Sequence, residues 1–164
     1  MGDRIDAGDL PIIVVSAEGS GQGKTAWVEA LTRELQARGR RVGVVKHHPH
    51  GVEAGGASGK DTARARAAGA AAAVLAEPGC LHLYQDGSDA ATLLERGVAA
   101  LRATAKVDVV LAEGFRAVTC RARVWVGGGT PPVGAPLCVR VEREDSRDVR
   151  CVSEVLSSLL AAWR

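Results

Sequence analysis

The sequence lacks several features that mark specialised classes of protein. Its formal net charge is only +2 over 164 residues, so the net charge does not indicate a general electrostatic attraction to nucleic acid or to a membrane surface. No apolar run approaches the length of a membrane span, and residues 1–6 are charged, unlike a signal peptide. We therefore expect a cytoplasmic protein that binds neither nucleic acid nor membrane.

Cysteine is scarce and scattered along the chain. The four cysteines, Cys80, Cys120, Cys138 and Cys151, form no Cys-x-x-Cys pair. Without such a pair, the sequence favours reduced, mostly packed thiols in a cytosolic protein over a disulfide framework.

Lysine is rarer than the overall basic content suggests. Of 21 Lys and Arg residues only Lys24, Lys46, Lys60 and Lys106 are lysines, and the first three lie in glycine- or histidine-rich segments. An ammonium group is a compact point charge suited to phosphate, and arginine is not its equivalent there. This placement points to anionic ligands.

The most informative segment that the chain does contain is residues 19–25, which read Gly-Ser-Gly-Gln-Gly-Lys-Thr. An apolar run at 11–16 precedes it and an amphipathic stretch ending at Gly39 follows, giving the order strand, glycine loop, helix. Backbone N–H groups of such a loop converge on an anion at the helix N-terminus. The Lys side chain reaches the outer phosphates and the Thr hydroxyl takes Mg²⁺. The segment predicts a nucleoside triphosphate site made of Gly19, Ser20, Gly21, Gln22, Gly23, Lys24, Thr25 and Ala26.

One position departs from the strict pattern of this phosphate-binding loop (P-loop). Glycine is expected six residues before Lys24, and the chain has Glu18 there. A carboxylate beside phosphates is unfavourable unless it turns to solvent, so we expect a reduced nucleotide affinity.

Strand and helix patterns alternate along the chain. Apolar runs predict strands at 11–16, 42–45, 73–76, 81–84, 107–112 and 137–141. Amphipathic patterns predict helices at 25–39 and 60–68, a third capped by Ser88 or Asp89, and a last one at 148–163. This order predicts an α/β fold, a P-loop NTPase whose mostly parallel sheet is flanked by helices on both faces. We expect a single nucleotide-binding domain over residues 1–164, with 1–10 as a loose segment.

The ends of the predicted strands carry the next candidates, because ligands of parallel sheets bind at the carboxyl ends of the strands. The 107–112 strand ends at Glu113, whereas Asp108 lies at its opposite end. Glu113 can therefore face the P-loop, where a carboxylate holds Mg²⁺ or orients its waters. Gly114 permits a close backbone approach there. We assign catalysis to Lys24 and Glu113, and metal binding to Thr25 and Glu113.

Three further groups of residues are candidates with open alternatives. Lys46 and His47 follow the 42–45 strand, and His47, His48 and His50 either bind metal or face phosphate and substrate. Lys60 and Arg64 follow Gly59, and either place positive charge near a second anion or form an exposed basic helix face, with Asp61 between them as a further cofactor-binding candidate. The chain has no Asn/Thr-Lys-x-Asp guanine motif, and Asp145 is the candidate acceptor for guanine N1 and N2.

These elements, in this order, resemble the MobB family, the molybdopterin-guanine dinucleotide biosynthesis protein B group. The resemblance covers about residues 11–116 and includes the P-loop, Lys46-His47, residues 59–62 with Arg64 and Arg66, residues 68–70, and the strand ending at 111–116. It implies a dimeric protein that binds GTP and Mg²⁺ and hydrolyses GTP slowly, as an accessory factor. It implies a role beside the guanylyltransferase MobA in attaching GMP to molybdopterin, with nucleotide contacts from the residues assigned above.

Other functions fit the same residues. A P-loop metallochaperone would deliver a metal ion through His47-His48-Pro49-His50, and a small-molecule kinase would use Asp61 as a base. A nucleotide-gated binding module with negligible turnover is a further alternative. Residues 120–129 depart from the family pattern, and their alternation predicts either an edge strand that pairs with a second chain or a hairpin with 137–141.

Overall fold

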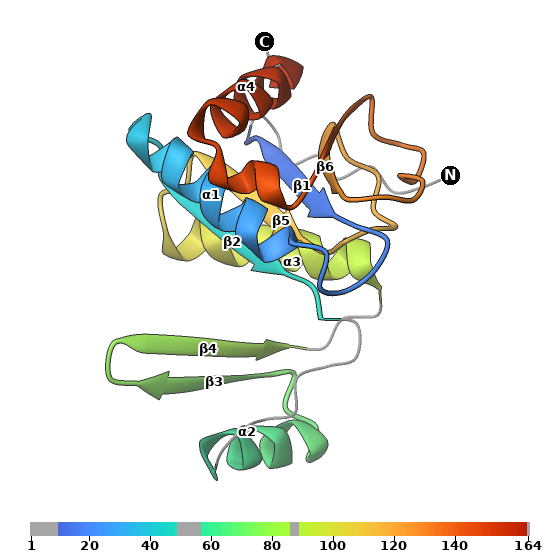
Figure 1. Ribbon diagram of the computed structural model, residues 1–164. Coiled ribbons are helices and arrows are strands. Elements are labelled where there is room, and N and C mark those ends of the chain that lie inside the picture. Colours follow the sequence, from blue (N-terminus) through green and yellow to red (C-terminus); the bar gives the residue numbers. More distant parts are fainter. Residues whose placement is uncertain (1–9, 49–56, 86–88, 164) are drawn as a thin grey trace. The chain divides into compact units, whose positions relative to one another are not determined.

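The computed structural model describes residues 10–48, 57–85 and 89–163. The chain divides into two compact units, which Figure 1 shows in the colours of the sequence. Unit 1 is Met1–His47 with Asp89–Arg164, and unit 2 is His48–Ser88. The single nucleotide-binding domain expected over residues 1–164 stays a prediction.

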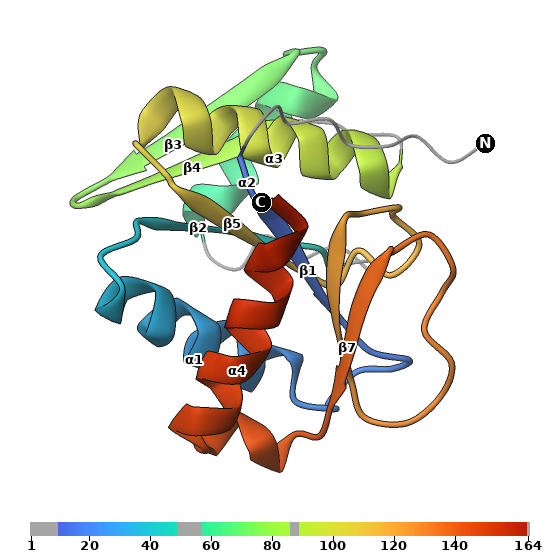
Figure 2. The same ribbon diagram turned by 90° about the horizontal axis from the view of Figure 1, so that it is seen from above.

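Unit 1 is built on a five-stranded sheet in the order β2-β5-β1-β6-β7, seen from above in Figure 2. Every neighbouring pair in this sheet runs parallel, so the predicted parallel sheet is confirmed. The strands are β1 (Ile12–Ser16), β2 (Val42–Lys46), β5 (Val109–Glu113), β6 (Ala122–Val126) and β7 (Leu137–Val141).

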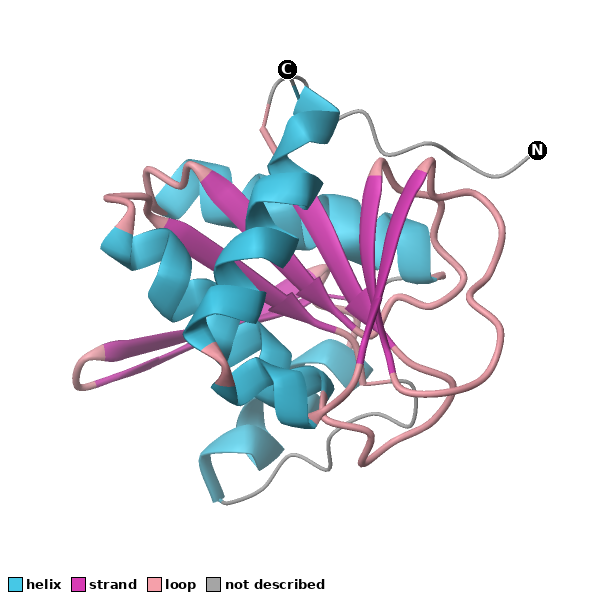
Figure 3. Ribbon diagram, turned by 45° about the horizontal axis from the view of Figure 1, so that its top comes forward, coloured by secondary structure: helices cyan, strands magenta, loops and turns pink. Residues whose placement is uncertain are grey.

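Helices cover both faces of this sheet, as predicted (Figure 3). Helices α1 (Lys24–Ala37) and α4 (Val149–Leu160) pack on one face and α3 (Ala90–Thr104) on the other. Successive residues of β1 point to opposite faces, so Ile13 joins the α1 and α4 core while Val14 joins the α3 core. Two 3₁₀ turns, Glu144–Arg147 and Ala161–Trp163, flank α4. A strand buried on both sides explains the unbroken apolar run in the sequence.

Unit 2 contains α2 (Ala57–Ala67) and an antiparallel hairpin of β3 (Ala72–Glu77) and β4 (Cys80–Gln85). The two short strands predicted here are confirmed, and the chain turns through Pro78 and Gly79, which has φ +78°. Helix α2 begins at Ala57, earlier than the predicted start at Lys60. One face of the hairpin carries Val74, Leu81 and Leu83, which are 58%, 70% and 54% exposed.

The expectation that residues 120–129 form an edge strand or an antiparallel hairpin is wrong. Strand β6 lies inside the sheet, pairs in parallel with both β1 and β7, and is buried along its whole length. Residues 127–136 connect it to β7 without a described helix or strand. The glycines that suggested a hairpin turn belong to this connection.

A buried arginine explains why the pattern of β6 was misleading. Arg123 is 1% exposed, and its guanidinium donates to Ser16 Oγ at 2.7 Å and to the carbonyl of Val118. Because those acceptors replace water, a charged side chain can stand inside the sheet, although its Nε has no partner. From the sequence alone, the same alternation of arginine with apolar residues indicates a strand with one face in solvent.

Candidate nucleotide-binding site

The predicted P-loop forms an exposed turn between β1 and α1. Gly21 and Gly23 adopt left-handed backbone conformations, with φ +73° and +97°, which favour glycine. Gly23 is the N-cap of α1 and makes no side-chain capping hydrogen bond. The N–H groups of the first helical turn are therefore available to an anion. Lys24 opens the helix and curls back, donating from Nζ to the carbonyl of Gly19.

The carboxyl ends of β2 and β5 lie side by side at this loop, and Glu113 is the residue that contacts both the loop helix and β2. Glu113 ends β5, pairs in register with Lys46 at the end of β2, and is 6% exposed. Thr25 donates its hydroxyl to Glu113 Oε1 at 2.8 Å, and Lys46 Nζ lies 3.2 Å from the same oxygen. The structure thus brings together Thr25, Lys46 and Glu113, which the sequence analysis had assigned from separate motifs.

The residues after Glu113 hold it in place. Gly114 has φ +95°, and a Cβ added there would lie 3.1 Å from His47 Cβ and 3.2 Å from its carbonyl oxygen. Phe115 has φ +34°, is 1% exposed, and stacks on the His47 ring with centroids 5.0 Å apart. The His47 N–H also donates to the Glu113 carbonyl at 2.9 Å. His47 therefore packs against this turn, and Gly114 allows the close approach that its position suggested.

Asp108 has a structural role at the opposite end of β5. The backbone N–H of Arg41 donates to it at 2.8 Å, and the guanidinium adds hydrogen bonds of 3.1 and 2.9 Å. These hydrogen bonds hold the pKa of Asp108 well below the usual range of a carboxyl group. The acid that faces the P-loop is Glu113, as the strand direction predicted.

A glycine turn at residues 127–129, which the sequence analysis did not assign to the site, packs against the P-loop. A Cβ on Gly127 would lie 3.1 Å from Gln22 Oε1, and one on Gly129 would lie 2.0 Å from Glu18 Oε2. The Glu18 side chain, although exposed, therefore lies against a residue that has no side chain to oppose it. The available signal was three successive glycines at the carboxyl end of a strand.

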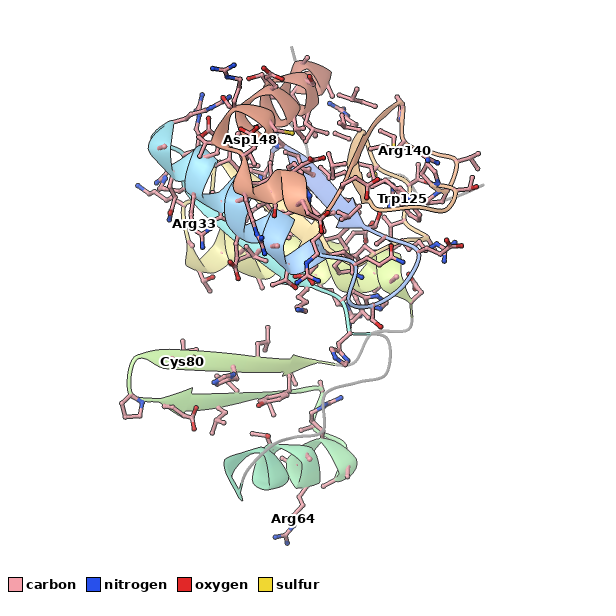
Figure 4. All side chains as sticks on the ribbon, viewed as in Figure 1. Arg33, Arg64, Cys80, Trp125, Arg140 and Asp148 are labelled. Atoms are coloured by element: carbon pink, nitrogen blue, oxygen red, sulfur yellow. The ribbon has the colours of Figure 1, made fainter. Side chains whose placement is uncertain are left out.

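Two side chains hold this glycine turn from the neighbouring strands. Trp125 donates from Nε1 to the Gly128 carbonyl at 2.9 Å, and Arg140 donates to the Gly129 carbonyl at 2.7 Å. Figure 4 labels both side chains on unit 1. Arg116 lies over the Trp125 ring at 5.7 Å and donates to the Glu18 carbonyl at 3.2 Å. Contacts of Trp125, Arg140 and Arg116 thus connect the glycine turn to the P-loop.

The loop after β7 contributes a further residue to the surroundings of the P-loop. A Cβ on Gly23 would lie 2.6 Å from Arg143 Cγ, so the stem of Arg143 packs on the loop. Asp145, the candidate acceptor for guanine, accepts the backbone N–H of Glu142 at 3.0 Å and so caps its own turn. Its role with a base stays a prediction.

The other predicted residues belong to unit 2, and several of them lie outside the described residues. The side chains of Lys60 and Asp61, and all of Pro49 and His50, lie outside the described residues. Arg64 is exposed on α2 in unit 2, where Figure 4 labels it. Among residues 10–48, 57–85 and 89–163, no three His, Cys, Asp or Glu side chains are grouped to hold a metal ion. In the same ranges, no helix is long and apolar enough to cross a membrane.

A parallel sheet flanked by helices, a glycine loop between β1 and α1, and an acidic residue ending the adjacent strand define a P-loop NTPase fold. Comparison with known proteins then gives the family. The model of "Molybdopterin guanine dinucleotide synthesis protein B", MobB, matches residues 12–125, and the chain belongs to this family.

Curated relatives and a solved structure agree with this family. The molybdopterin-guanine dinucleotide biosynthesis adapter protein of Escherichia coli K12 is 35% identical over 107 residues, and the probable adapter protein of Bacillus subtilis 168 is 36% identical over 110. Each alignment covers 65% of this chain and only 60% of the relative. A crystal structure of B. subtilis MobB aligns over 92% of this chain and 98% of its own, with TM-score 0.54 and 26% identity.

The position of Glu18 predicts its effect on the binding of phosphate ligands. Glu18→Gly should tighten binding of a nucleoside triphosphate, because it removes a like charge, worth about 1 kcal/mol or about fivefold in affinity at an exposed site. Glu18→Gln is the matched control, which removes the charge and keeps the side chain. Isothermal titration calorimetry measures both. Weaker binding by both variants would show that the carboxylate is a working part of the site.

Proposed function

We propose that this protein binds GTP with Mg²⁺, hydrolyses it slowly, and acts as an adapter in the biosynthesis of molybdopterin guanine dinucleotide. The observation that carries the proposal is the hydrogen bond of 2.8 Å between Thr25 and Glu113 at the start of the P-loop helix. It joins the hydroxyl of the loop motif to a buried carboxylate at the end of a neighbouring strand. Family membership supplies the pathway.

The residues of the site fit a magnesium nucleotide. Oxygen donors from a hydroxyl and a carboxylate suit Mg²⁺, and Thr25 and Glu113 would hold it directly or through water. The ion, when bound, neutralises negative charge on the phosphates. Lys24 and the N–H groups of the first turn of α1 bind the phosphates, and Glu113 orients water around them. Lys46 adds a second ammonium group at the same edge of the sheet.

The preference for GTP is proposed from the family alone. The loops after β6 and β7, which contain Gly127 and Arg143, pack on the P-loop, and we propose that they contact the base. We propose that Asp145 also contacts it, with the carboxylate oxygen that does not cap the turn.

We propose molybdopterin and the guanylyltransferase MobA as partners, in the cytoplasm. The pathway named by the family and by the curated adapter proteins supports this proposal, and MobA is the partner that the family resemblance implies. Lys60 and Arg64 of α2 are proposed to contact an anionic ligand and Asp61 to contact a hydrogen-bond donor of the same ligand, since all three belong to the motif shared with the family.

The decisive experiment is calorimetric titration with GTP, ATP and molybdopterin, with and without Mg²⁺. Lys24→Ala should lower the affinity for the triphosphate at least about tenfold, because a charge-assisted phosphate contact is lost while the fold is kept. Lys106→Ala, an exposed lysine after α3, is the control and should bind like the wild type. Unchanged affinity of Lys24→Ala for both GTP and ATP would contradict the proposal.

The two acids of β5 give a second test. Glu113→Gln keeps the shape of the side chain and loses its charge, so Mg²⁺-dependent hydrolysis should fall more than nucleotide binding without metal. Asp108→Asn is the matched control at the other end of the strand, where the carboxyl pairs with Arg41. A single-turnover GTPase assay compares them. If Asp108→Asn abolished hydrolysis and Glu113→Gln did not, the assignment of Glu113 would be wrong.

We propose a homodimer that buries the apolar face of the β3–β4 hairpin. Val74, Leu81 and Leu83 lie on this face, opposite the half-buried Leu75, and a two-stranded sheet needs a covered face for stability. Leu81→Lys should dissociate the dimer in sedimentation velocity at micromolar concentration. Val133→Lys changes an equally apolar, 98% exposed residue of unit 1 and serves as the control. A monomeric wild type, with and without GTP, would remove the dimer.

A further inference from the structure

Lys46 and Glu113 form an ion pair whose two members differ in their freedom to move. The side chain of Glu113 is 7% exposed and that of Lys46 is 53% exposed. Glu113 is fixed by the turn that follows it, whereas Lys46 stands at the end of β2, the edge strand of the sheet. If one partner of this pair moves, it is the lysine.

The contacts of the Glu113 carboxylate with Thr25 and Lys46 fall on one oxygen. Oε1 accepts from Thr25 Oγ1 at 2.8 Å and has Lys46 Nζ at 3.2 Å. A buried carboxylate needs a compensating positive charge, and in this structure the ammonium group of Lys46 supplies it. In the proposed function the same carboxylate serves a divalent cation, so two positive charges compete for one acid.

We propose that Lys46 is the counter-ion of Glu113 only while the site lacks metal, and that it turns to the phosphates of the nucleotide when Mg²⁺ is bound. This inference rests on the proposed function and adds a role to it. Mg²⁺ would increase the affinity for the nucleotide phosphates in two ways, through its own contacts and by releasing Lys46 to bind them. The long, half-exposed stem of Lys46 can change direction without opening the core.

Lys24 provides an internal comparison for this behaviour. Its ammonium group is also held by a protein oxygen, the carbonyl of Gly19, but a neutral carbonyl competes weakly with phosphate. Lys24 should therefore reach the phosphates whether or not metal is present. Lys46 is held by a full negative charge and should not leave it without a replacement.

The test measures the contribution of Lys46 to phosphate affinity, both when Glu113 holds the lysine and when it does not. Lys46→Met is introduced into the wild type and into Glu113→Gln, and each variant is compared with the protein from which it was made. Calorimetry measures the affinity for a non-hydrolysable GTP analogue and for inorganic tripolyphosphate, which has no base. In EDTA, Lys46→Met should cost little in the wild type. In Glu113→Gln, where no carboxylate holds the lysine, it should cost about tenfold in affinity. In the wild type with Mg²⁺ it should again cost about tenfold.

The alternative is an ion pair that stays in place and acts only through its charge. Lys46→Met would then change the affinity by the same factor, within about twofold, in every background and condition. That result overturns the inference and leaves the proposed function intact. A wild type that binds neither triphosphate ligand, with or without Mg²⁺, overturns the proposed function and this inference with it.

Two controls keep the comparison interpretable. Lys106→Met removes an exposed lysine at the other end of the sheet and should show no dependence on metal. Thermal melting checks that each variant folds. Lys46→Met should melt below the wild type in EDTA, because buried Glu113 loses its counter-ion. Mg²⁺ with the GTP analogue should raise the melting temperature of Lys46→Met less than that of the wild type, because the variant binds this ligand about tenfold more weakly. Equal shifts in the two proteins count against the inference.

Discussion

The position of β5 between β1 and β2 is the constraint on which the candidate site depends. In parallel strands the register sets which ends meet, and here Glu113 stands beside Lys46 on one side and Val15, near the start of the P-loop, on the other. Because side chains alternate along a strand, a slip of one residue would turn Glu113 away from Thr25. The apolar residues of β5, buried on both faces, fix that register. The packing of the core therefore also determines the position of the Glu113 carboxylate.

The same register determines the electrostatics of the site. Burial of Glu113 makes its charge costly unless positive or hydrogen-bonding groups face it, and Thr25 and Lys46 provide both. The lysines at this edge, Lys24 and Lys46, are each held by a protein oxygen. The strength of each acceptor sets how readily each lysine is released to an anionic ligand.

Local patterns in the sequence were sufficient for the P-loop, the parallel sheet and the choice of Glu113 over Asp108. Each depends on the order of nearby residues and on one general rule, that ligands lie at the carboxyl ends of parallel strands. The convergence of Thr25, Lys46 and Glu113 on one carboxylate oxygen could not be read in this way. It depends on which strands are neighbours, and strand order is a property of the whole sheet.

The place of β6 shows where local patterns fail. Arg123 is charged, so its alternation with apolar neighbours indicates a solvent-facing side, but Ser16 and Val118 satisfy its guanidinium inside the sheet. Both acceptors come from other segments of the chain, and neither is visible from the strand itself. Once β6 is interior, its carboxyl end falls beside the P-loop, and the glycines that follow become the wall against which Glu18 and Gln22 pack. Because Arg123 can be buried with its guanidinium hydrogen-bonded to Ser16 and Val118, β6 is an interior strand, and residues 127–129 belong to the candidate site and not to a hairpin turn.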